Sequence, residues 1–105
     1  MKLSVFAYYN KLIKAFDTKM QFDDHEDDKV VFNVMRGLNA RLALGTYNDL
    51  RYLQFYKLGT FDDESGIFEA DKTMLLDFDD AIASFECKAS MKGDKQDVGN
   101  ERSAN

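Results

Sequence analysis

The sequence predicts an α+β domain, in which a small antiparallel sheet of about four strands packs on one main helix. Segments 3–9 and 50–59 are rich in Val, Leu, Phe and Tyr, which favour strands. Between them, residues 25–43 repeat apolar side chains with a helical period. Polar residues 62–66, DDESG, separate two apolar runs as in a hairpin. Because the chain has 105 residues, 45% of them apolar, we expect a single domain over residues 1–87.

The first two strands are expected to pair with each other. Residues 3–9, LSVFAYY, form the first strand, and Asn10-Lys11 turns the chain. Residues 12–22, LIKAFDTKMQF, carry apolar side chains in partial alternation with other types. We therefore expect a second strand in this segment. A short helix over residues 11–16 is the alternative.

The main helix is expected at about residues 25–43. Acidic residues fill the segment that precedes and begins it, DDHEDD at 23–28, and carboxylates favour the positive end of a helix dipole. Gly45 fits the position after the last turn. The apolar stripe of the helix recurs at spacings of three and four residues, through Val31, Val34, Met35, Leu38 and Leu42.

The same acidic run allows a second interpretation, a divalent-metal site made of Asp23, Asp24, His25 and Asp27. One histidine among adjacent carboxylates does not have a recognisable ligand spacing, so helix capping is favoured. General acid–base chemistry by His25 would also need a second catalytic group, and the sequence indicates none. We therefore predict neither a metal nor another cofactor.

The C-terminal half is expected to contain a strand at 50–59, a hairpin turn at 62–66 and a short helix at about 79–87. Gly66 supplies the positive φ that such a turn requires. A calcium loop does not fit, because the glycine comes one position early and Thr73 replaces the final glutamate. Residues 88–105 are mostly small or polar, which predicts a flexible tail.

Charge and cysteine content narrow the function classes. The formal net charge is −5, so the chain as a whole lacks the basic excess that is typical of nucleic-acid binding. The single cysteine, Cys87, excludes an internal disulfide and a multi-cysteine zinc site. No apolar window reaches the roughly 18 residues of a membrane helix, and the N-terminus does not read as a signal peptide. A soluble intracellular protein with no membrane contact is expected.

Three stretches of the chain resemble the small non-structural protein of gokushoviruses, the fifth viral protein of these single-stranded-DNA microviruses of bacteria. They are SVFAYYNKLIKAF, FDDHEDDKVVFNVMRGLNA and YNDLRYLQFYKLGTFDDESGIFEA. The last stretch resembles a family pattern of a strand and a glycine-containing turn. Two departures are the absence of a proline near DTKMQFDD and the presence of Ser65 where threonine is usual. The pattern is structural and specifies no chemistry.

The resemblance implies a non-enzymatic phage protein that binds single-stranded DNA and acts in viral genome replication, in the cytoplasm of the host bacterium. Such binding uses aromatic side chains for base stacking beside cations for phosphates. The alternative is a protein-interaction module, either a homodimer or an adaptor for a viral replication protein or a host protein. If the first strands pair with the strand at 50–59, one surface would gather the candidate DNA-binding residues Tyr8, Tyr9, Lys11, Lys14, Lys19, Arg51, Tyr52, Tyr56 and Lys57.

Overall fold

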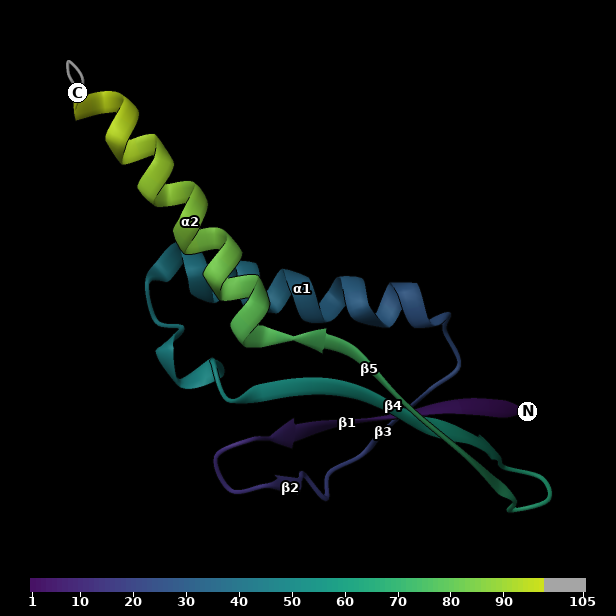
Figure 1. The fold of residues 1–105 in the computed structure, drawn as a ribbon. Coiled ribbons are helices and arrows are strands. Elements are labelled where there is room, and N and C mark those ends of the chain that lie inside the picture. Colours follow the sequence, from purple (N-terminus) through teal and green to yellow (C-terminus); the bar gives the residue numbers. More distant parts are fainter. Residues whose placement is uncertain (98–105) are drawn as a thin grey trace.

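A five-stranded antiparallel sheet forms the body of the protein in the computed structural model (Figure 1). The structure describes the backbone of residues 1–97 and the side chains of residues 1–89. The strand order is β2-β1-β4-β5, and β3 also pairs with β1. Two helices, α1 and α2, complete the described chain, so the predicted α+β class is confirmed. The strands are β1 (Lys2–Asn10), β2 (Ala15–Phe16), β3 (Gln21–Asp23), β4 (Leu53–Asp62) and β5 (Phe68–Asp77).

The expected second strand is divided into two short strands, and both pair with β1. β2 lies opposite Tyr9 and Asn10, whereas β3 lies opposite residues 4–6. Between them the Asp17 carboxylate accepts a hydrogen bond from the Lys19 amide at 2.9 Å, which stabilises the connection between the two strands. The alternative helix over residues 11–16 is not formed, because residues 11–14 make turns and Ala15 begins β2.

α1 (Asp27–Leu44) matches the predicted main helix. Its first turn carries Asp27 and Asp28, as expected from the helix dipole. The prediction that an acidic side chain caps the helix is wrong, because Glu26 occupies the N-cap position and forms no capping hydrogen bond. Gly45 ends the helix with φ 74°, and its amide donates to the carbonyl of Leu42 at 3.2 Å. A single turn of 3-10 helix at Asn48–Leu50 then leads into β4.

The hydrophobic core lies between the sheet and the two helices. Phe6 of β1 and Phe55 of β4 stack with their ring centres 5.5 Å apart, and neither is exposed. Both helices pack on the same side of the sheet, and α2 leads away from the sheet beyond its first turns (Figure 1). The helices contribute Val30, Leu38, Leu42, Phe78 and Ile82 to this core.

The predicted hairpin turn between β4 and β5 is confirmed. The Asp62 carboxylate accepts a hydrogen bond from the Glu64 amide at 3.0 Å, and this bond lowers the pKa of Asp62 below its ordinary value. Gly66 has φ 74°, and its amide donates to the Asp62 carbonyl at 2.8 Å. The amino group of Met1 lies 3.0 Å from a carboxylate oxygen of Asp63.

The C-terminal helix α2 (Phe78–Asp97) is longer than expected and includes the first ten residues of the predicted tail. Asp77 stands before it and accepts a hydrogen bond from the Asp79 amide at 3.3 Å. Residues 88–97, KASMKGDKQD, mix good helix formers with serine, glycine and aspartate, so their composition did not predict that the helix continues. The remainder of the predicted tail, 98–105, lies outside the described residues. Neither helix, within the described part of the chain, is apolar enough over a sufficient length to cross a membrane.

Candidate nucleic-acid interface

The side of the sheet opposite the helices carries a cluster of three aromatic rings. Phe6 and Tyr8 of β1 point toward the core, so Tyr9 points to the other side, because side chains alternate along a strand. The rings of Tyr9 and Phe16 lie 4.8 Å apart, and Tyr56 lies 5.2 Å from Phe16. We call this side of the sheet the helix-free face, and the cluster of Tyr9, Phe16 and Tyr56 the aromatic platform.

One lysine adjoins the aromatic platform. The Lys72 ammonium group of β5 lies 6.0 Å from the centres of both the Phe16 and the Tyr56 rings. This distance is at the outer limit of a cation–π contact. Lys72 is exposed, and the described residues place no carboxylate within salt-bridge distance of it. Tyr56 donates a hydrogen bond to the Gln54 side chain at 3.3 Å, which helps to hold the ring in place.

The nine predicted binding residues do not gather on this face. Tyr9 and Tyr56 belong to the platform, but Tyr8 faces the helices and packs against Phe55 at 5.0 Å and Phe78 at 6.0 Å. Burial raises the pKa of the Tyr8 hydroxyl above its ordinary value. Register explains the separation, since neighbouring residues on one strand must face opposite sides of a sheet.

Lys57 lies on the helix side of β4. Its ammonium group is 2.9 Å from the Asp27 carboxylate at the start of α1, and Ser4 donates a hydrogen bond to the same carboxylate at 3.3 Å. Lys57 is therefore a structural cation of the sheet–helix contact.

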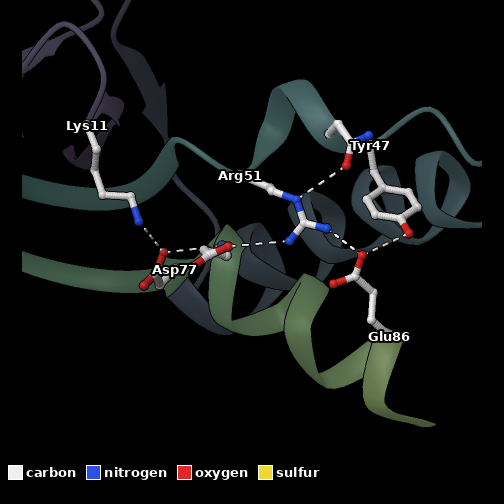
Figure 2. A network of polar contacts seen from close by, with 7 residues as sticks. Lys11, Tyr47, Arg51, Asp77 and Glu86 are labelled. Carbon is white, nitrogen blue, oxygen red and sulfur yellow. Dashed lines mark hydrogen bonds and ion pairs between the residues drawn. The ribbon is translucent and has the colours of Figure 1, made fainter. Parts of the chain in front are cut away.

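Arg51 is held in a polar network between the 3-10 turn and α2 (Figure 2). Its guanidinium group pairs with the carboxylates of Glu86 and Asp79, the latter at 3.5 Å. Tyr47 donates a hydrogen bond to Glu86 at 3.2 Å. The hydrogen bond with Glu86 raises the pKa of Arg51 above its ordinary value.

Lys11 also forms an ion pair, next to the Arg51 network (Figure 2). Its ammonium group lies 3.5 Å from the Asp77 carboxylate, which precedes α2 (Figure 2). The other predicted residues are exposed: Lys14 in the turn after β1, with φ 55°, Lys19 between β2 and β3, and Tyr52 before β4. Within the described residues, neither Lys14 nor Lys19 forms a salt bridge.

The distal end of the helix-free face, nearest the hairpin turn, is apolar. Phe22 of β3 packs edge-on against Phe61 of β4, with ring centres 5.7 Å apart. Phe68 of β5 lies directly opposite Phe61 in the sheet register. We call Phe22, Phe61 and Phe68 the apolar end. Phe22 and Phe68 are 51% and 46% exposed, so this end of the sheet presents aromatic carbon to solvent.

The acidic run before α1 brings three of the four considered metal ligands together. The imidazole of His25 lies 2.6 Å from the Asp23 carboxylate and 3.4 Å from that of Asp24. The His25 amide also donates to Asp23, and this bond lowers the pKa of the Asp23 carboxyl. Asp27 is directed elsewhere, toward Lys57. The three clustered side chains are largely exposed, and their internal hydrogen bonds account for their positions.

Sequence reasoning missed two members of the candidate interface, Phe16 and Lys72. The alternation of the segment 12–22 put Phe16 in a strand but did not reveal which face it shares with Tyr9. Lys72 was missed because the segment after the turn was interpreted by its apolar residues alone. A strand beginning at Phe68 and paired with β4 would have placed Lys72 on the face of Tyr56.

Comparison of the chain with family models, curated proteins and solved structures found no match. The relation to gokushovirus proteins stays a prediction from the resemblance.

Proposed function

We propose that this protein binds single-stranded DNA through the aromatic platform, as a non-structural factor of a small single-stranded-DNA phage in genome replication or in the switch to single-strand synthesis. The observation that carries the proposal is the position of Lys72 beside the Phe16 and Tyr56 rings on a sheet face that no described helix covers. Aromatic rings can stack with a base, while a nearby cation binds the phosphate of the same strand.

The ion pairs limit how strongly DNA can be held. Lys11, Arg51 and Lys57 already bind carboxylates, which leaves Lys14, Lys19 and Lys72 as candidate phosphate contacts. Each phosphate contact to a single strand contributes about −0.7 to the slope of log affinity against log salt concentration. Three contacts therefore predict a slope of about −2, together with weak, micromolar binding at low salt.

The test is a fluorescence-anisotropy titration of a labelled 12-nucleotide thymidine strand at about 20 mM salt, repeated over a salt series. Lys72→Gln is expected to weaken binding several-fold and to reduce the slope by about 0.7, because one phosphate contact is lost. Lys29→Gln, which removes an exposed lysine of α1, is the matched control and should leave both quantities unchanged. Absence of binding by the folded protein at low salt would overturn the proposal.

A protein-interaction module without nucleic-acid activity is the second candidate. The observation that favours it is the pairing of three of the five predicted cations with carboxylates of the same chain. On this alternative the oligonucleotide titration shows no binding, while the helix-free face still contacts another protein chain.

A further inference from the structure

Opposite charges flank the apolar end on its two sides. The hairpin turn on one side of it carries Asp62, Asp63 and Glu64 around the amino group of Met1, which leaves two negative charges in excess. Lys72 lies on the other side, four residues beyond Phe68 along β5. If two copies meet face to face with their β5 strands antiparallel, the acidic turn of each copy lies over Lys72 of the other. An isologous contact therefore repeats the same favourable charge pair twice.

The size of the helix-free face suits a weak dimer. Strands of 9 and 10 residues rise about 3.3 Å per residue and span roughly 30 Å. Four strand positions about 4.8 Å apart add a width of roughly 19 Å. Complete overlap of two such faces would bury about 1,100 Å², and overlap centred on the apolar end buries less, so the contact belongs to the small, transient class of interfaces.

Self-association through the sheet edge is less favourable. The described residues leave the outer edge of β5 unpaired, but Glu69, Asp71 and Lys72 are charged and exposed along it. Charged side chains on an edge strand oppose edge-to-edge pairing. The helix-free face, in contrast, presents three apolar side chains to solvent, those of Phe22, Phe68 and Met74. Exposed aromatic groups gain most from a second apolar surface.

We infer that the helix-free face is the interface of a weak homodimer, in which two sheets pack face to face around Phe22, Phe61 and Phe68. In this orientation the acidic turn of the partner reaches Lys72, the cation beside the Phe16 and Tyr56 rings. A second copy and single-stranded DNA therefore compete for this surface. Only that competition rests on the proposed function; the dimer itself does not.

The dimer is tested by sedimentation velocity on the full chain, without DNA, at protein concentrations from about 5 to 200 μM, a range that brackets a weak interface. A concentration-dependent shift from monomer to dimer is expected. Phe68→Glu should weaken the dimer at least tenfold, whereas Phe32→Glu, a substitution at a 62% exposed site on α1, should not. A chain that stays monomeric throughout, or a dimer that Phe68→Glu leaves intact, overturns the inference.

Charge reversal gives a second test that does not depend on the aromatic core of the contact. Glu64→Lys and Lys72→Glu should each weaken the dimer, and the double variant should restore it, because the pair is re-formed with opposite signs. Circular dichroism checks that each variant is folded. Equal dimerisation of all four proteins, or no recovery in the double variant, contradicts the proposed orientation.

Adding the thymidine strand to the dimer separates the two proposals. Competition predicts that the dimer dissociates into monomer–oligonucleotide complexes as the strand is titrated. A dimer that binds the strand without dissociating overturns competition and leaves DNA binding in place. A dimer that never binds the strand overturns the proposed function and leaves the dimer in place.

Discussion

The ammonium group of Lys57 lies 2.9 Å from the carboxylate of Asp27, so a central strand of the sheet is joined to the first residue of α1. Both side chains are partly buried. Ser4 of the neighbouring strand donates a hydrogen bond to the same carboxylate. The contact fixes the position at which α1 begins above the sheet.

Replacing Lys57 with methionine should lower the free energy of unfolding by about 1 kcal/mol, because the Asp27 carboxylate loses its partner in a partly buried site. Oligonucleotide affinity should not change, since Lys57 lies on the side of the sheet opposite the platform. Urea denaturation and the anisotropy titration measure the two quantities. Lys29→Met is the control for stability. A loss of DNA binding with unchanged stability would contradict the structural role.

Gly59 of β4 is required by a close approach between β4 and β5. A Cβ atom at this position would lie 2.1 Å from the Glu69 carbonyl oxygen and 2.8 Å from the Phe68 ring, and φ is 156°. Gly59→Ala should therefore destabilise the protein by about 2 kcal/mol or more. Gly37→Ala, in α1, meets no atom within 4 Å and should stabilise it by up to about 1 kcal/mol. Thermal unfolding of both variants measures the contrast, and equal effects would exclude the steric explanation.

The sequence predicted the elements whose periodicity and end signals agree. The predicted stripe through Val34, Met35, Leu38 and Leu42 and the glycine at position 45 located α1 to within two residues. The first member of the stripe was wrong, because Val30 and not Val31 lies in the core. The turn at 62–66 was equally well marked. The strands within segment 12–22 were less clearly marked, because the partial alternation of this segment reflects two short strands that both pair with β1.

The candidate interface was harder to predict because it depends on register. Tyr8 and Tyr9 are adjacent and equally suited to stacking, yet one faces the helices and the other faces away from them. Composition does not show which cations are neutralised within the chain. The partners of Lys57 and Arg51 lie 30 and 35 residues away, at Asp27 and Glu86, and only the fold brings them together.

Ile82 attaches α2 to the sheet. Its side chain is fully buried in the core with Phe6 and Phe55. Ile82→Ala should lower the free energy of unfolding by about 3 kcal/mol, through lost burial and the cavity that remains. The matched control is Ile13→Ala, at a 68% exposed site, which should change stability by less than about 0.5 kcal/mol. Urea denaturation compares the two, and a small effect at Ile82 would mean that α2 is not part of the cooperative core.

The network around Arg51 holds the start of β4 against α2, and a double-mutant cycle measures that coupling (Figure 2). Arg51→Met should destabilise the protein, because Glu86 and Asp79 both lose their cation. Glu86→Gln should have a smaller effect, since the amide keeps a hydrogen-bond acceptor for Tyr47. The coupling should shrink at 1 M salt, where the Debye length falls to about 3 Å. Additive single substitutions at low salt would show that the network is too exposed to join these elements, and that the hydrophobic contacts of α2 suffice.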